Sequence, residues 1–329
     1  LAQLNSPAKL TTIMNRVYTI RGSIMLEEII TSKATLTAIP VFFIAIFIET
    51  ILVRFFKFKG TNGVKDDLVS IFIGLVSHLA NGAAAFLTIG MLVWFQQYQI
   101  TALPLTIGTF LLCFFLDDLR FYLHHRIAHR VRWGWAMHVT HHSSTRYSMA
   151  VALRQGWTKH FSGTTILKVP LVLIGFDPVL VLFCGALNAI YQFFLHTEMI
   201  HKLPNWFEAI FNTPSHHRVH HARNPKYLDM NYAGTFIIWD RMFGSFTAED
   251  LEDIPDFGLV KNLETFNPLH IIFHEYWSML KDVFGSNRTL LDRLLYIIAP
   301  PGWSHDGSRM TSIQIKQAES LVVVPVKTD

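Results

Sequence analysis

The sequence predicts an all-α, multi-pass membrane protein with four to five spanning helices and a cytoplasmic helical cap. Of the 329 residues, 51% are hydrophobic and only 16% are charged, whereas roughly 25% of the residues in a soluble domain are charged. The apolar residues also gather in runs close to the roughly 20 residues that a helix needs to cross a bilayer. Composition and distribution therefore indicate the same class of protein.

The apolar runs give the spanning helices in chain order. They cover residues 35–53, 68–95, 103–115, 164–176 and 179–194. The third run passes without a break into the polar segment 117–132, so this helix is expected to extend beyond the bilayer. Asp177 and Pro178 separate the last two runs. This dipeptide is typical of a turn, so we expect a membrane hairpin at about 164–196.

Loop charge orients these helices, because short loops rich in Lys and Arg stay on the cytoplasmic side of a membrane. The loop at 54–67 and the region around 120–132 are basic, whereas the turn at 96–102 carries no charge. The basic segments and the histidine-rich site are therefore expected on the cytoplasmic face. This orientation fits a bacterial inner membrane and the endoplasmic reticulum equally well.

The remaining boundaries follow from the change in composition along the chain. We expect an N-terminal segment at 1–34, transmembrane helices at 35–116, a histidine-box domain at 117–246, a C-terminal cap at 247–303 and a flexible tail at 304–329. Within the cap, apolar residues recur at three- and four-residue steps from Leu269 to Phe284, which predicts a one-sided helix. Such a helix lies along the membrane surface or packs on the cap.

Charge and cysteine content argue against two other classes of protein. The net charge of +4 comes without a dense Lys/Arg run, so no nucleic-acid partner is expected. Cys113 and Cys184 both lie within apolar runs and lack the spacing of paired cysteines. Neither a disulfide framework nor a thiolate metal site is therefore predicted.

The histidines are strongly clustered. Thirteen of the 17 fall between His124 and His221, mostly in the motifs HHRIAHR, HVTHH and HRVHH. Steps of three and four residues bring imidazoles to one face of a helix, so each motif presents two or three nitrogens to a shared centre. The eight residues concerned are His125, His129, His138, His141, His142, His217, His220 and His221. A single histidine is more often a core or interfacial residue, but eight at these spacings indicate a metal site.

Two metal ions are expected, because eight nitrogens exceed the four ligands that satisfy a structural zinc ion. Imidazole suits iron, zinc, copper and nickel alike, so the ligand type does not identify the metal. A site just below a bilayer is placed to receive a lipid chain, and oxidation of an unactivated C–H bond requires a redox metal and O2. We therefore predict two non-haem iron ions, which zinc is able to replace in a purified protein.

Several neighbouring residues are candidates for the same site. His196 ends the last apolar run and is a ninth candidate ligand, while Glu198 and His201 follow it closely. His160 is a further candidate that no spacing supports. Asp118 shares a helical stripe with His125, so it is expected to accept a hydrogen bond from a ligand's second N–H group.

Two further histidines adjoin members of the motifs without belonging to them. His124 and His216 each precede a motif histidine by one position. One position corresponds to about 100° on a helix. Both are therefore expected to point away from the metal site.

The segment from about residue 117 to 246 resembles the fatty acid hydroxylase/sterol desaturase superfamily. It carries DDLRFYLHHRIAH, HVTHHSS, HTEMI and TPSHHRVHHARNPKYLDMNYAGTFIIWDRMFGSF. Within that superfamily the chain is similar to the alkylglycerol monooxygenase branch, through ALRQ at 152–155, HTEMI at 196–200 and PPGW at 300–303. Arg130 departs from that branch, which commonly has an acidic residue after the second histidine of the first motif.

The resemblance implies a di-iron centre held by the eight motif histidines and His196, with Asn231, Trp239 and Asp240 as supporting residues. It also implies O2-dependent hydroxylation of a fatty acyl, ether-lipid or sterol-like substrate. The electrons would come from a separate donor, such as a b-type cytochrome, a ferredoxin with its reductase, or a reduced pterin.

Two alternatives to a hydroxylase remain open. A lipid or sterol desaturase would use the same centre and remove a second hydrogen. A membrane zinc-binding or metal-transport protein would keep the ligands without the chemistry. Transport places ionisable residues along the spanning helices, whereas the histidine motifs lie outside the apolar runs.

Overall fold

The computed structural model describes residues 37–60 and 63–322. These residues form helices joined by loops, and their only β-type pairings are two isolated bridges. The all-α prediction is therefore confirmed for the described part of the chain. The predicted N-terminal segment 1–34 lies outside the described residues.

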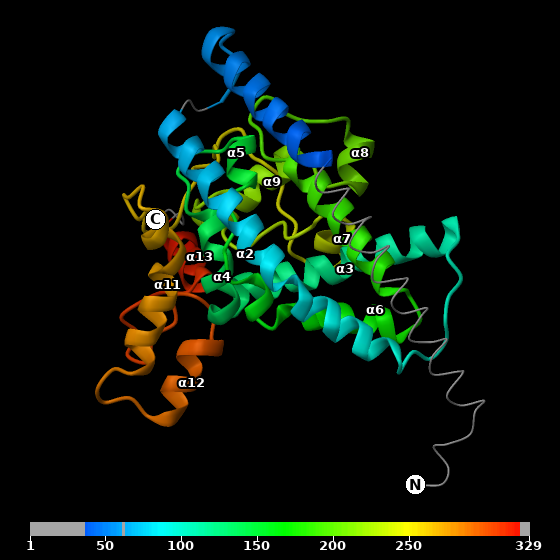
Figure 1. The fold of residues 1–329 in the computed structure, drawn as a ribbon. Coiled ribbons are helices and arrows are strands. Elements are labelled where there is room, and N and C mark those ends of the chain that lie inside the picture. The colour runs from blue at the N-terminus through cyan, green and yellow to red at the C-terminus, as the bar shows by residue number, and fades with distance from the viewer. Residues whose placement is uncertain (1–36, 61–62, 323–329) are drawn as a thin grey trace, which may run out of the picture.

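Two helices among the described residues are long and apolar enough to cross a membrane: the first helix, Thr37–Phe55, and α2, Val64–Gln96 (Figure 1). With 33 residues, α2 is about 50 Å long, whereas the bilayer core is about 30 Å thick. Its exposed face carries large apolar residues such as Phe72, Leu79 and Phe86, and its buried face carries Asp66, Ser70, Ser77 and Thr88. This distribution is the reverse of a soluble surface helix.

Helix α3, Ile107–Arg130, is the centre of the fold and packs most extensively against α4, Arg132–His142, and α7, Pro178–Phe193 (Figure 1). As predicted, it continues without a break from its apolar first half into its polar second half. The expected turn before α7 is also present, because Asp177 caps the helix by accepting a hydrogen bond from the backbone N–H of Val179.

The arm of the hairpin before this turn is shorter than expected. It consists of the 3₁₀ turn η2, Thr164–Lys168, and α6, Val169–Leu173. The tip of the hairpin contacts the loop before α3, where the N–H of Ile100 donates to the carbonyl of Leu173 at 2.8 Å. All the histidine motifs lie at the other end of α3, so the histidine-rich end of the bundle is opposite the uncharged loop 97–106.

The C-terminal part has three helices: α11, Pro268–Val283, α12, Leu290–Ile298, and α13, Ser312–Val322. Of these, α11 and α12 pack against α4. The predicted one-sided helix is present as α11, which buries Ile271 and Ile272 against Ile73 of α2. Arg132 joins α4 to α11 through ion pairs of 2.6 Å to both Glu275 and Asp282.

Helix α13 lies within the segment 304–329 that we predicted to be a flexible tail. It packs against η3, Pro225–Tyr227. Five short elements complete the described fold: α5 at Met149–Ala152, η1 at Lys159–Phe161, α8 at Asn205–Ile210, α9 at Pro214–His221 and α10 at Ile238–Met242.

Candidate metal centre

Nine buried or half-buried histidines converge where α3, α4, α9 and the end of α7 meet. They are the eight motif histidines and His196. The helical spacing explains the convergence, because each motif lies on one helix and turns its imidazoles to one side. They form two groups, and within each group the ligand atoms all lie within 4.8 Å of one another.

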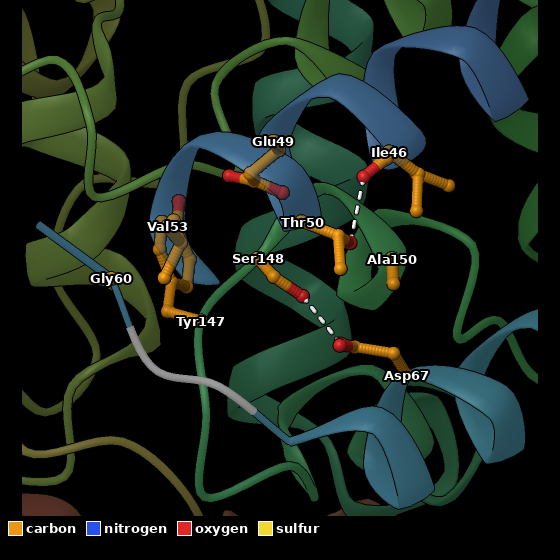
Figure 2. A pocket seen from close by; sticks show the side chains of 9 residues that line it. All are labelled: Ile46, Glu49, Thr50, Val53, Gly60, Asp67, Tyr147, Ser148 and Ala150. Atoms are coloured by element: carbon orange, nitrogen blue, oxygen red, sulfur yellow. Dashed lines mark hydrogen bonds between the residues drawn. The ribbon is translucent and has the colours of Figure 1, made fainter. Parts of the chain in front are cut away.

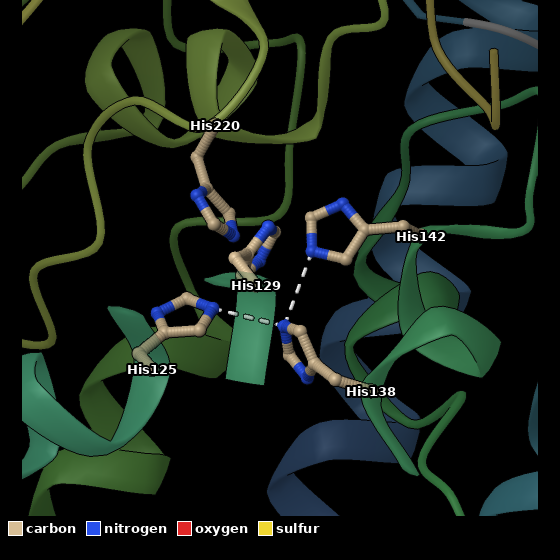
Figure 3. A group of neighbouring side chains, drawn as sticks. All are labelled: His125, His129, His138, His142 and His220. Atoms are coloured by element: carbon tan, nitrogen blue, oxygen red, sulfur yellow. Dashed lines mark hydrogen bonds between the residues drawn. The ribbon is translucent and has the colours of Figure 1, made fainter. Parts of the chain in front are cut away.

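The first group contains His125, His129, His138, His142 and His220 (Figure 3). In it, the Nε2 atom of His138 lies 2.9 Å from Nε2 of His125 and 3.2 Å from Nε2 of His142. Figure 3 shows the five rings facing a common centre from three helices, α3, α4 and α9. The group therefore offers five nitrogens to one position.

The second group contains His141, His196, His217 and His221. The Nε2 atom of His196 lies 3.2 Å from Nε2 of His141 and 3.2 Å from Nε2 of His217. The two groups adjoin, because the rings of His142 and His221 stack with centroids 4.4 Å apart. A molecule bound at one group is thus in the immediate neighbourhood of the other.

Backbone carbonyls fix the orientation of three of these rings. The Nδ1 atom of His125 lies 2.8 Å from the carbonyl oxygen of Tyr232, that of His196 lies 2.8 Å from the carbonyl of Gln192, and that of His220 lies 3.0 Å from the carbonyl of Met230. Since a carbonyl only accepts, Nδ1 carries the proton in each case. The lone pair of Nε2 is then free and directed into the group.

The donor set fits a metal ion. The Nε2 atoms of His129, His220 and His221 are buried and have no hydrogen-bond partner among the described residues. A buried nitrogen without a partner is unfavourable, and a bound metal ion would satisfy it. Burial also lowers the pKa of His196 to about 4 and holds that of His138 well below its usual value. These imidazoles are therefore neutral at physiological pH, which is the form that binds metals.

Asp118 does not have the role predicted from its helical stripe. Its carboxylate accepts hydrogen bonds from the backbone N–H groups of Thr235 and Phe236, from Nε1 of Trp239 and from the side chain of Asn188. None of the hydrogen bonds that it makes to described residues involves a histidine. Seven residues separate it from His125, which is about 10 Å along a helix and too far for direct contact.

The other predicted supporting residues order the loop between η3 and α10. Asp240 accepts hydrogen bonds from the N–H groups of Tyr232 and Ala233, both at 2.8 Å. Trp239 donates to Asp118. Asn231 has a positive φ of 55° and donates to the carbonyls of His216 and Thr247. Asp240 thus supports His125 indirectly, through the carbonyl of Tyr232.

Three residues beside the groups were not predicted. Asp229 lies 3.4 Å from Nδ1 of His129, and the side-chain amide of Gln155 lies 3.2 Å from Nδ1 of His141. The ring of Tyr232 contacts that of His129, with centroids 5.3 Å apart. In each of these contacts the two residues are 14 or more positions apart in the sequence, and one of them lies in a loop. Helical spacing therefore does not predict them.

Four other histidines and Glu198 belong to neither group. The Nδ1 atom of His160 lies 2.7 Å from the hydroxyl of Thr88 on α2. His216 faces Glu208, 3.8 Å away. His124, His201 and Glu198 are likewise absent from both groups. The positions of His124 and His216 agree with the expectation that they point elsewhere.

A cleft lies beside the second group, between the first helix and α5 (Figure 2). Tyr147 lines this cleft, and its ring stacks on that of His196 with centroids 5.6 Å apart. Glu49 also lines it and accepts hydrogen bonds from the hydroxyl of Thr197 at 2.6 Å and from the N–H of Met149 at 2.7 Å. The first helix is therefore tied to the residue that follows His196.

Fold and site together define a helical protein that presents nine histidines in two adjoining groups suited to metal ions. The family model for fatty acid hydroxylase matches residues 110–245, which include every member of both groups. A curated protein of related sequence is 34% identical over 91% of this chain and 69% of its own length. The chain belongs to the fatty acid hydroxylase family.

Alkylglycerol monooxygenase of Caenorhabditis elegans is 36% identical over 73% of this chain and 49% of its own length. The enzyme of that name from Danio rerio is 34% identical over 91% of this chain and 69% of its own length. An ornithine lipid hydroxylase of Rhizobium tropici is 26% identical over 44% of this chain and 43% of its own length. No solved structure matches. The chain thus spans about half to two thirds of the alkylglycerol monooxygenases.

Proposed function

We propose that the protein is an O2-dependent lipid monooxygenase whose two histidine groups hold two iron ions. The observation that carries this proposal is the pair of adjoining groups, with five and four convergent nitrogens. One tetrahedral zinc ion needs only four ligands. The names of the relatives, two monooxygenases and a hydroxylase, support an oxidative reaction on a lipid.

The iron ions would supply the activation of O2 and the removal of hydrogen from a C–H bond. The chain's own residues provide the geometry. Carbonyls of Gln192, Met230 and Tyr232 hold three imidazoles in one tautomer and one orientation. The buried rings of Tyr147 and Tyr232 pack beside the two groups and exclude water that would compete with the lipid.

We propose an ether lipid of the alkylglycerol type as the substrate. The support is the printed name of the relatives and the extent of similarity to them. Insertion of one oxygen atom at the carbon next to the ether oxygen consumes O2, two electrons and two protons, and releases water. The product is a hemiacetal, which breaks down to a fatty aldehyde and glycerol. The two electrons require a separate donor, such as a reduced pterin or a small redox protein.

We further propose that the bilayer surrounds the first helix, α2, the first half of α3 and the α6–α7 hairpin, which gives four to five spans. The reversed distribution of polar and apolar residues on α2 supports this placement. At the histidine end, Arg126, Arg130 and Arg132 are close to the groups, whereas the loop 97–106 carries no charge. The positive-inside rule then assigns the histidine end to the cytoplasm.

The test combines metal analysis with product analysis on detergent-purified protein. The protein is loaded anaerobically with ferrous iron, given a chemical reductant, and exposed to O2 in the presence of an alkylglycerol. We expect two iron ions per chain and release of fatty aldehyde that depends on O2. His141→Ala, in the second group, should abolish release, while His270→Ala, at an exposed position on α11, should retain it.

Other outcomes would point to other functions. Loss of two hydrogens from a lipid without gain of oxygen would identify a desaturase. Binding of zinc in preference to iron, with no lipid product under any reductant, would replace the enzyme with a metal-binding protein. Full aldehyde release by His141→Ala would contradict the assignment of the second group to catalysis.

A further inference from the structure

One histidine of the first group is oriented differently from its neighbours. His125 and His220 each direct Nδ1 at a backbone carbonyl. His129 instead directs Nδ1 at a carboxylate oxygen of Asp229, 3.4 Å away, and its Nε2 atom is buried and has no partner among the described residues. A carboxylate behind an imidazole fixes the ring and makes its other nitrogen a stronger ligand.

The carboxylate of Asp229 is itself held in place by the C-terminal helix. Its Oδ2 atom accepts a hydrogen bond from the hydroxyl of Ser312, the first residue of α13. Arg130 lies 3.6 Å from the same oxygen. With Oδ2 engaged from one side, Oδ1 is left to face His129.

The backbone at Asp229 adds to this arrangement. Asp229 has a positive φ of 55°, a left-handed conformation that Asp and Asn adopt more readily than other residues with a side chain. Helix α13 packs on η3 directly before this residue. The helix is capped independently, because Thr311 and Gln314 bond to each other. Contacts with both the backbone and the side chain therefore link α13 to the loop that carries Asp229.

We propose that α13 is a positioning element of the first metal group, acting through Ser312 and Asp229 on His129. This inference rests on the proposed function only in taking the first group to bind a metal ion. Helix α13 begins more than 90 residues beyond the last histidine motif and contains no histidine of its own.

The test is a metal-release titration of the purified full chain, loaded with ferrous iron and equilibrated with increasing chelator. Iron retained per chain is measured without reference to activity. In the wild type, both groups should release iron at high chelator concentration. Asp229→Asn keeps the size of the side chain and tolerates the positive φ, but removes the charge. It should lower the affinity of one of the two ions about tenfold or more.

Substitutions at Ser312 separate positioning from folding. Ser312→Ala should weaken the same single ion, by less than Asp229→Asn, while the melting temperature of the iron-free protein stays that of the wild type. Ser312→Thr keeps the hydroxyl and should restore retention. Ser320→Ala is the matched control, because Ser320 lies on the same helix, is exposed, and its hydroxyl donates to the carbonyl of Gln317 within α13.

The outcomes distinguish this inference from the proposed function. If the wild type retains two iron ions and both Ser312→Ala and Asp229→Asn release them as the wild type does, the role of α13 is refuted and the di-iron proposal stands. If Ser312→Ala weakens both ions equally, the effect is general and the site-specific role is also refuted. If the wild type itself retains no metal, the di-iron proposal is refuted before any variant is compared.

Discussion

Replacement of Asp118 by Asn should destabilise the fold without touching a histidine. Each oxygen of this buried carboxylate accepts two hydrogen bonds: Oδ1 from Asn188 and Thr235, and Oδ2 from Phe236 and Trp239. An asparagine has one accepting oxygen, and its amide nitrogen only donates. Whichever way the amide is turned, two buried donors lose their acceptor.

The size of the effect follows from that count. A buried donor left without a partner costs about 1–3 kcal/mol, so Asp118→Asn should cost about 2–6 kcal/mol of the free energy of unfolding. Even the lower end corresponds to a fall in Tm of roughly 3 °C for a chain of this length. Thermal unfolding of the metal-free protein in detergent, followed by tryptophan fluorescence, measures the shift.

The matched control is Asp256→Asn. Asp256 is exposed and pairs with Arg223 at 2.8 Å. An exposed ion pair contributes about 0–1 kcal/mol, so its loss should hardly change Tm. If Asp118→Asn melts no lower than Asp256→Asn, the four contacts of Asp118 do not stabilise the fold and this reasoning is wrong.

Three further changes test neighbouring features. Asp240→Asn removes one of the two acceptors that hold the N–H groups of Tyr232 and Ala233, so the affinity of the first group for iron should fall about tenfold in chelator titrations. Gly234→Ala should lower Tm, because a Cβ there lies 2.4 Å from the side chain of Asn188, while Gly90→Ala, with open space around it, should not. Acid should destabilise the metal-free protein, because His196 is protonated near its ordinary pKa of 6.5 in the unfolded chain but only near 4 in the folded chain. About 3 kcal/mol of the free energy of unfolding is therefore lost as the pH falls from above 6.5 to 4. Melting curves recorded at pH values above 6.5 and between 6.5 and 4 measure this loss.

The positions of the histidines could be predicted because they depend on local geometry. Steps of three and four residues bring side chains together on any helix, whatever the rest of the fold does. His196 was identified because it ends an apolar run, and that run ends as α7 at Phe193. The same reasoning was wrong for Asp118, because a shared stripe gives only the direction of a side chain, and seven positions separate Asp118 from His125 by about 10 Å along the helix axis.

The residues that orient the histidines could not be predicted in this way. Gln155 meets His141 from the loop after α5, and Asp229 meets His129 from the loop after η3. The carbonyl of Tyr232 reaches His125 across 107 positions of sequence. A backbone carbonyl is present in every residue, so no residue type marks the ones that serve as acceptors. Only the path of the loop selects them.

That path explains why the motif NYAG accompanies the histidine motifs. Within residues 229–234, one loop supplies the carboxylate that faces His129 and the carbonyls that accept from His220 and His125. Asn231 has the left-handed backbone conformation between those two carbonyls. Gly234 lies so close to the side chains of Asp118 and Asn188 that there is no room for a Cβ atom.

The second group depends on different supports. His196 is oriented by the carbonyl of Gln192 within the last turn of α7, and His141 by Gln155. Neither contact involves the loop at 229–234. The two groups nevertheless share helices, because α4 carries His138, His141 and His142, and α9 carries His217, His220 and His221. Changes in that loop should therefore weaken the first group more than the second. The two histidine groups are thus oriented by different hydrogen bonds, although α4 and α9 carry members of both.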